Sequence, residues 1–264
     1  MKLIKIIKKS KYHLLLSVLP IVIVAGGFKV AAHLLGWEVI PKELTSFFPS
    51  ILTGIIFILG FLLAGVVTDY KESEKIPNEI AGSLFAIWQE ADYIRITTNS
   101  KAAENLMNKL KNFVPTFKND FFILQNDKLT KLLNSFSSDI IEIGREGAPP
   151  NYVIRMKAEV AALKKLIGRI SVIQNTDFVP SIFISIRAIS IIFLSVYCLL
   201  SVEPWWGGLI LVAIFTFVIF TIIYLIKDME NPFEYDGSDD VKSDEVSLEV
   251  LDNLQKEFNE LNFN

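Results

Sequence analysis

Four long apolar runs determine what this 264-residue chain can fold into. A helix needs about 20 apolar residues to cross a bilayer, and such runs occupy residues 14–36, 47–68, 180–202 and 205–226. Only short connections separate the first run from the second and the third from the fourth. We therefore predict an all-α membrane protein with four transmembrane helices in two hairpins, and with a cytosolic helical bundle inserted between them.

The distribution of lysine and arginine predicts the orientation of these helices. Five lysines stand among the first eleven residues, whereas the connection after the first run holds only Lys42 and the connection after the third holds no basic residue. Basic residues collect on the cytoplasmic side of a membrane. We therefore expect a multi-pass protein of the cell inner (plasma) membrane with both termini in the cytoplasm. A cleaved signal peptide is the alternative for the N-terminus, but no small-x-small cleavage site leads into a soluble domain.

The middle segment has helical rather than strand periodicity. It predicts amphipathic helices over about 78–96, 100–114, 127–144 and 151–173. The tail from Asp228 carries twelve acidic residues and two lysines, and it predicts a helix over 247–258 that docks through Leu248, Leu251, Leu254 and Phe258. The expected organisation is a basic N-terminus (1–13), a first hairpin (14–69), a cytosolic helical domain (70–178), a second hairpin (179–227) and an acidic tail (228–264).

The second apolar run has two different faces. At 100° per residue, every small or polar residue from 50 to 68 falls within one arc of about 140°, and the branched aliphatic residues fill the rest. We call this arc the Phe57 face, and it consists of Ser50, Thr53, Gly54, Phe57, Gly60, Phe61, Ala64, Gly65 and Thr68.

Two interpretations of the Phe57 face follow. Small residues let helices approach closely, so the face could be a packing seam within one subunit. The bulky rings of Phe57 and Phe61 fit a seam poorly. If several copies surround an axis, the rings would instead form a hydrophobic constriction, whose electropositive aromatic edges tolerate anions. That second interpretation requires a cyclic oligomer.

Two motifs resemble the bestrophin family. FILGF at 57–61, followed by VVT at 66–68, resembles the pore helix, in which a similar F-x-L-G-F stretch supplies two of three stacked neck residues. The third lies one turn earlier and is Thr53 here, where the family usually has an aliphatic residue. ENPFEYDGSDD at 230–240 resembles the N-P-F and acidic cluster after the last span, although Tyr235, Gly237 and Ser238 interrupt the acids.

The resemblance implies a homopentameric, mainly chloride-selective channel with a neck at Phe57, Phe61 and Thr53. Bacterial relatives include cation-permeable members, so the selectivity for small inorganic ions stays open. The family's calcium clasp corresponds to Asp236, Asp239 and Asp240, whose carboxylates are suitable calcium ligands. A solvated acidic linker is the alternative for these three residues.

Three basic side chains lie within the apolar runs. Lys29 and His33 stand one turn apart and would share a helix face. They predict either an outer vestibule that concentrates anions or a lysine that reaches the headgroups. Arg187 is a candidate for the inner mouth of the pathway, or else an anchor at the interface.

No catalytic constellation is visible in the sequence. It has no glycine-rich phosphate loop, nucleophile elbow or Cys/His zinc spacing, and we expect neither an enzyme nor a nucleic-acid partner. The competing hypothesis is a non-conducting membrane scaffold whose cytosolic bundle binds a partner.

Overall fold

The computed structural model describes residues 13–123, 127–175, 180–233 and 245–260. Within these residues the regular structure is helical apart from one bridge between Ile40 and Leu200, so the predicted all-α class is confirmed for the described part of the chain. The chain divides into two compact units. One, the apolar unit, contains residues 13–70 and 180–232, and the other, the bundle unit, contains most of residues 71–175 together with 245–260.

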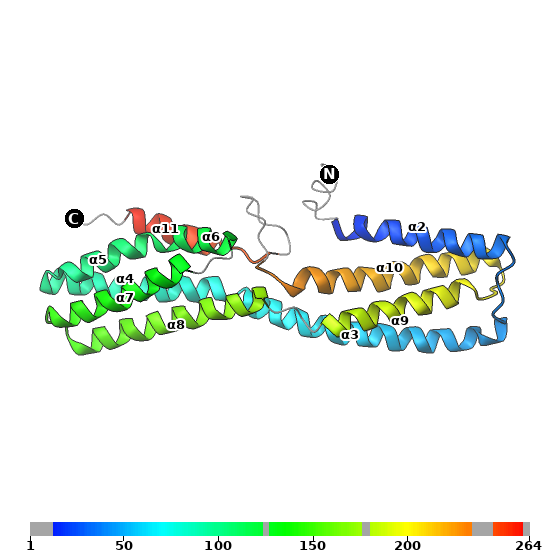
Figure 1. Ribbon diagram of the computed structural model, residues 1–264, viewed down its shortest axis with the longest axis horizontal. Coiled ribbons are helices and arrows are strands. Elements are labelled where there is room, and N and C mark those ends of the chain that lie inside the picture. The colour runs from blue at the N-terminus through cyan, green and yellow to red at the C-terminus, as the bar shows by residue number, and fades with distance from the viewer. Residues whose placement is uncertain (1–12, 124–126, 176–179, 234–244, 261–264) are drawn as a thin grey trace. The chain divides into compact units, whose positions relative to one another are not determined.

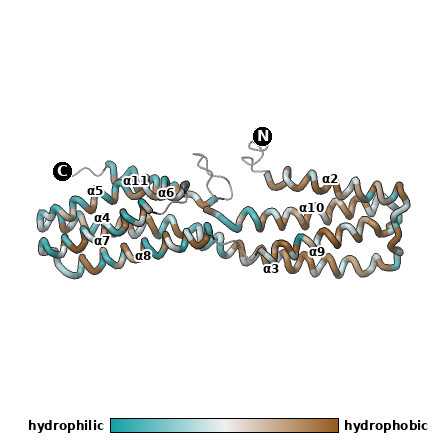
Figure 2. Tube along the Cα trace, viewed as in Figure 1, coloured by the Kyte–Doolittle hydropathy of each residue, from teal (hydrophilic) through white to brown (hydrophobic). Residues whose placement is uncertain are grey.

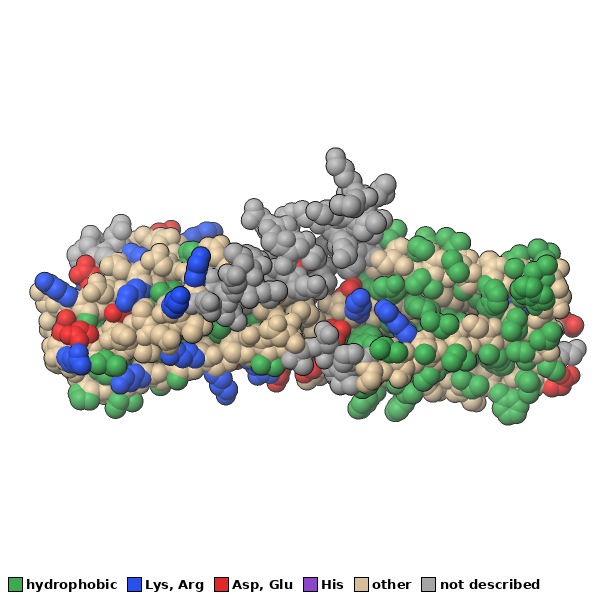
Figure 3. Space-filling view, viewed as in Figure 1, with side chains coloured by type: hydrophobic (Ala, Val, Ile, Leu, Met, Phe, Trp, Pro, Cys, Tyr) green, Lys and Arg blue, Asp and Glu red, His purple; other side chains and the backbone are tan. Residues whose placement is uncertain are grey.

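Four helices of the described chain are long and apolar enough to cross a membrane, which agrees with the four predicted spans. Figure 2 shows the hydrophobic residues concentrated along them, and Figure 3 shows a surface rich in hydrophobic side chains on the face that is in view. Such a surface is stable in lipid rather than in water, so the chain is a multi-pass membrane protein. The elements of the apolar unit are α2 (His13–Leu34), the 3-10 helix η1 (Lys42–Phe47), α3 (Phe48–Ser73), α9 (Pro180–Cys198) and α10 (Trp205–Glu230).

Helix α10 is the central helix of the apolar unit. It packs along α2 and also contacts α9, and Figure 1 shows α2 and α3 on opposite sides of these two helices. Helix α3 joins the core through Phe48, whose ring lies 5.2 Å from Tyr197 and 5.9 Å from Phe193. The first predicted hairpin is therefore not a packed pair. Its connection joins α2 and α3 only at their ends, whereas small residues such as Gly26, facing Leu209, let α2 lie against α10.

The two connecting segments of the apolar unit are bonded to each other. The Ile40 N–H donates to the Leu199 carbonyl at 3.2 Å, and the Ser201 N–H donates to the Ile40 carbonyl at 3.1 Å. Helix α9 ends at Cys198, earlier than the predicted end at residue 202, because the backbone after it pairs with Ile40. The connection between α9 and α10 is thus longer than Glu203 and Pro204 alone.

The C-terminus of α2 is closed by a glycine in the left-handed region. Gly36 has φ +65°, and the Trp37 N–H donates to the Ala32 carbonyl at 2.8 Å while the Gly36 N–H donates to the His33 carbonyl at 3.2 Å. This pair of bonds is the Schellman motif, which satisfies carbonyls that the end of a helix leaves free. It turns the chain sharply toward Glu38 and Ile40.

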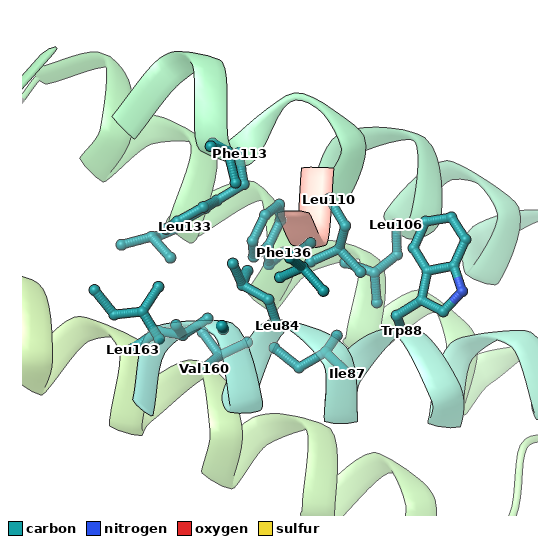
Figure 4. Close-up of a cluster of buried hydrophobic side chains, with 14 of the residues drawn as sticks. Leu84, Ile87, Trp88, Leu106, Leu110, Phe113, Leu133, Phe136, Val160 and Leu163 are labelled. Carbon is teal, nitrogen blue, oxygen red and sulfur yellow. The ribbon is translucent and has the colours of Figure 1, made fainter. Parts of the chain in front are cut away.

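The bundle unit contains the predicted amphipathic helices and one more. Its core gathers Leu84, Leu110, Phe136 and Leu163 from four different helices (Figure 4), all of them fully buried. The additional helix is α6, which contains Pro115 in its first turn, whereas the predicted helix over 100–114 ends before this proline. Proline is tolerated in the first turn of a helix, where its missing N–H has no partner to lose. The helices are α4 (Ile76–Thr98), α5 (Lys101–Lys111), α6 (Phe113–Ile123), α7 (Asp127–Arg145), α8 (Pro150–Asn175) and α11 (Glu249–Glu260).

The C-terminal helix α11 docks on the bundle through the predicted residues. Leu248, Leu251, Leu254 and Phe258 are all buried. The Phe258 ring stacks on Trp88 of α4 with centroids 4.4 Å apart and planes 14° apart. The acidic tail therefore returns to the bundle unit at its C-terminal helix.

Candidate functional site

Helix α3 packs against its own subunit with one side only. Ile55, Leu59 and Val66 are buried in the core of the apolar unit. At 100° per residue these three lie close to the direction opposite Phe57. The core of the subunit therefore lies behind the helix as seen from the Phe57 face.

All nine residues of the Phe57 face are exposed. The side chains of Phe57 and Phe61 are 73% and 74% exposed. A Cβ atom added to Gly54, Gly60 or Gly65 would meet nothing within 4 Å. The interpretation of this face as a packing seam within one subunit was therefore wrong, because no other helix among the described residues lies against it.

Both threonine hydroxyls of the face bond to the helix itself. Thr53 Oγ1 donates to the Pro49 carbonyl at 2.8 Å, and Thr68 Oγ1 donates to the Ala64 carbonyl at 2.9 Å. These bonds lower the cost of placing a hydroxyl in an apolar setting. They also engage the hydroxyl hydrogens, so the two aromatic rings dominate the chemistry of the face. The rings are one turn apart, about 6 Å along the axis.

Exposed aliphatic residues border the Phe57 face on both sides. Ile51 and Ile58 lie on one border and Ile56 on the other, and each is at least one-third exposed. Helix α3 therefore has three zones, which are a buried side, two aliphatic borders and a central aromatic and small-residue face. The aliphatic borders are suited to contact with lipid or with a neighbouring subunit. The central face differs in composition from the two borders.

Lys29 is fully buried, contrary to both sequence interpretations, which required an accessible ammonium group. Its Nζ donates to Glu38 Oε1 at 2.6 Å, to the Leu200 carbonyl at 2.7 Å and to the Cys198 carbonyl at 3.3 Å. Gly208 makes room for the side chain, because a Cβ atom there would lie 3.1 Å from Lys29 Cε. All three ammonium protons of Lys29 are engaged in these hydrogen bonds, which hold the two connecting segments together. The ammonium group is therefore not accessible to anions.

His33 completes this cluster on its more exposed side. Its Nδ1 lies 3.1 Å from Glu38 Oε2, and its ring stacks on Trp205 with centroids 5.1 Å apart. Burial alone would raise the pKa of Glu38, but the hydrogen bonds and charges of Lys29 and His33 outweigh it, so the pKa lies below its usual value. Glu38 is a residue of this cluster that was not predicted from the sequence. A buried lysine needs a carboxylate partner, and Glu38 is the nearest acid along the chain.

Arg187 is the remaining predicted site residue that lies within the described ranges. Arg187 is exposed on α9 and makes no ion pair with another described residue. Asp236, Asp239 and Asp240 lie outside the described residues. Within the described ranges no group of three or more His, Cys, Asp or Glu side chains could hold a metal ion.

Comparison with solved structures identifies the fold. No family model and no curated protein matches the sequence. Three variants of a bacterial Bestrophin homolog from Klebsiella pneumoniae superimpose with TM-scores of 0.74, 0.69 and 0.69 at sequence identities of 10%, 13% and 14%. The alignments cover 94% to 96% of this chain and 97% to 99% of the others. At this identity the match is one of fold, and it confirms that the chain has a bestrophin-like fold.

Proposed function

We propose that the protein is an oligomeric, bestrophin-like ion channel in which the Phe57 faces of several copies surround the ion pathway. The observation that supports it is the exposure of all nine residues of the Phe57 face, directly opposite the buried side of α3. One helix face cannot enclose a pore, so the proposal requires a cyclic oligomer. By analogy with the bestrophins we propose a homopentamer.

In this proposal Phe57 and Phe61 form the neck, and Thr53 is the third neck residue. Stacked rings about 6 Å apart make an apolar constriction that gates by dewetting. The face carries no charged side chain, and the hydroxyl hydrogens of Thr53 and Thr68 are bonded to helix carbonyls. The electropositive edges of the rings then favour anions such as chloride without binding them tightly.

The orientation of the channel follows from the lysine distribution. The N-terminal lysines and the bundle unit are on the cytoplasmic side of the inner membrane in this proposal, together with the acidic tail. The cluster of Lys29, His33 and Glu38 then lies at the outer end of the apolar unit, and Arg187 is the candidate for the inner mouth.

We also propose Asp236, Asp239 and Asp240 as ligands of a regulatory calcium ion, since carboxylate oxygens suit that ion. Purified protein should melt at a higher temperature in calcium than in a chelator. An unchanged melting temperature would discard the calcium site without affecting the channel.

The channel is tested by currents from purified protein in planar bilayers. Phe57→Ala combined with Phe61→Ala should raise the current several-fold, because it removes the apolar constriction. The matched control is Ile51→Ala with Ile58→Ala, two exposed residues at the border of the same helix, which should leave the current within twofold. If the oligomer passes no current and the neck variant changes nothing, the non-conducting scaffold is the better description.

A further inference from the structure

The bundle unit exposes an apolar face along α8. Ile154 and Val172 are 65% and 61% exposed. Between them, at steps of three and four residues, lie Ala158, Ala161, Lys165 and Gly168, all exposed and on the side of α8 opposite the buried Met156, Val160, Leu163 and Ile170. We call these six residues from Ile154 to Val172 the α8 outer face. Its spacing is that of a helix seam, and its small centre lets another helix approach closely.

The α8 outer face is basic. Lys165 lies within it, and Lys157 and Lys164 stand along one edge. Lys157 and Lys165 make no ion pair with another described residue, and Lys164 bonds only the neutral Asn134, at 3.0 Å. A surface that covers this face should therefore carry negative charge.

A second surface of the bundle unit has the complementary character. An open groove of about 350 Å³ runs between α4 and α11, and its walls include Gly82, Phe85 and Val250. A Cβ atom added to Gly82 would meet nothing within 4 Å, so the groove is open at this point. Glu257 lines the groove, and Glu249, Lys256 and Glu260 are exposed on the same helix, so the net charge of these four residues is negative. The groove is therefore apolar at its base and acidic along α11.

The two surfaces lie on opposite flanks of α4. Ser83 donates to Glu159 of α8 at 2.7 Å, whereas Phe85 lines the groove beside α11. Residues two apart in a helix point about 160° away from each other. The α8 outer face and the α4–α11 groove therefore cannot meet within one subunit, but one can meet the other on a neighbouring copy.

We propose that the α8 outer face of one subunit docks into the α4–α11 groove of the next copy of this chain. The contact is head-to-tail, and a head-to-tail contact forms a ring when the rotation between successive copies closes, as the proposed channel requires. A two-fold contact between α8 outer faces would instead bring lysines against lysines. This inference rests on the proposed function only in that both need an oligomer.

Cysteine cross-linking of the full chain in detergent tests the contact. Ala161→Cys on α8 and Asn253→Cys in the groove, combined in one chain, should yield covalent species up to the complete ring with a short bifunctional thiol reagent. The native Cys198 is buried, so the unmodified protein is the blank. Cross-linked dimers from Ala161→Cys alone would reveal a two-fold contact, and an oligomer without cross-links from the double variant would exclude the docking. Either result overturns the inference.

Charge reversal tests the basic and acidic components. Lys165→Glu should lower the cross-linked yield at least threefold, Glu257→Lys should do the same, and the two together should restore it. Lys131→Glu, an exposed lysine of α7, is the matched control and should change nothing. Equal yields from Lys165→Glu and Lys131→Glu, or no restoration by the double reversal, would contradict the proposal.

Two further measurements distinguish a failure of the docking proposal from a failure of the channel proposal. Mass in detergent and current in bilayers are recorded on the same samples. A ring-sized, conducting protein without cross-links would eliminate the docking mode alone. Cross-linked rings that pass no current would eliminate the channel and leave the docking intact.

Discussion

Helices α3 and α10 have the same length, 26 residues, and both are strongly apolar. They differ in where small and polar residues lie, because such residues are buried in α10 and exposed in α3. In α10, Gly208 and Thr216 are buried, and the space above Gly208 is occupied by Lys29. In α3, Gly60 and Thr68 are exposed, and a Cβ atom added to Gly60 would meet no atom of the described residues within 4 Å. The fold of one subunit therefore explains the small residues of α10 but not those of α3. The proposed ring of subunits would account for the Phe57 face.

The largest expected effect on stability comes from the pair of Lys29 and Glu38, near the end of α10 where Lys29 lies against Gly208. Glu38→Gln removes the carboxylate that neutralises a fully buried lysine, and breaking such a pair costs about 3–5 kcal/mol. Thermal unfolding in detergent should therefore shift strongly downward. Glu43→Gln, an exposed carboxylate of η1, is the control, and equal melting temperatures for the two variants would show that the pair contributes little.

Low pH should remove the stabilisation that the Glu38 carboxylate provides. The pKa of Glu38 lies below its usual value in the folded protein, so its stabilising effect is complete above the usual carboxyl range and is lost as the pH falls through the folded value. The difference in melting temperature between the parent and Glu38→Gln should be constant near neutral pH and should shrink in acid. A difference that stays the same at low pH would contradict this assignment.

Replacing one glycine in α10 and one in α3 by alanine compares how tightly the two helices are packed at these positions. In Gly208→Ala the new Cβ lies 3.1 Å from Lys29 Cε and 3.2 Å from Val202 Cβ, and such overpacking costs about 1–3 kcal/mol. Gly60→Ala meets nothing in the subunit and should be neutral, or favourable by up to about 1 kcal/mol through helix propensity. Melting temperatures in detergent measure both. A Gly60→Ala variant as damaged as Gly208→Ala would show that the Phe57 face is needed for folding.

The smallest expected effects come from two threonines. Thr216 is fully buried, and its hydroxyl has no hydrogen-bond partner among the described residues, so Thr216→Val should raise the free energy of unfolding by about 1 kcal/mol. Thr68→Val loses only an exposed bond to its own helix and should stay within about 0.5 kcal/mol of the parent. Unfolding curves showing that Thr216→Val is destabilised would indicate that this hydroxyl has a partner in the folded protein.

Much of the fold was predictable because it depends on local pattern. Helical periodicity identified the docking residues Leu251, Leu254 and Phe258 of α11, and the helical wheel separated the buried Leu59 from the exposed Phe61. These predictions require only that a helix keeps a constant turn per residue.

Pairings between distant segments were not predictable in the same way. Helix α10 is apolar nearly all round, so its sequence does not specify that α2 rather than α3 lies against it. Lys29 was expected to be accessible because its partners, Glu38 and the carbonyl oxygens of Cys198 and Leu200, are brought to it only by the connecting segments. Burial of a charge depends on such three-dimensional neighbours, and a single helix does not reveal them.

The central claim is that the Phe57 face contacts water in the assembled protein, and thiol accessibility tests it most directly. Gly54→Cys and Gly65→Cys lie on the face, while Ile51→Cys and Ile58→Cys lie on its aliphatic border. A charged, membrane-impermeant reagent attacks only hydrated thiolates. We predict that, in liposomes, it modifies the two face cysteines at least tenfold faster than the border cysteines and alters the current as it does so. Equally slow modification at all four positions would place the Phe57 face in lipid or protein and would contradict the account.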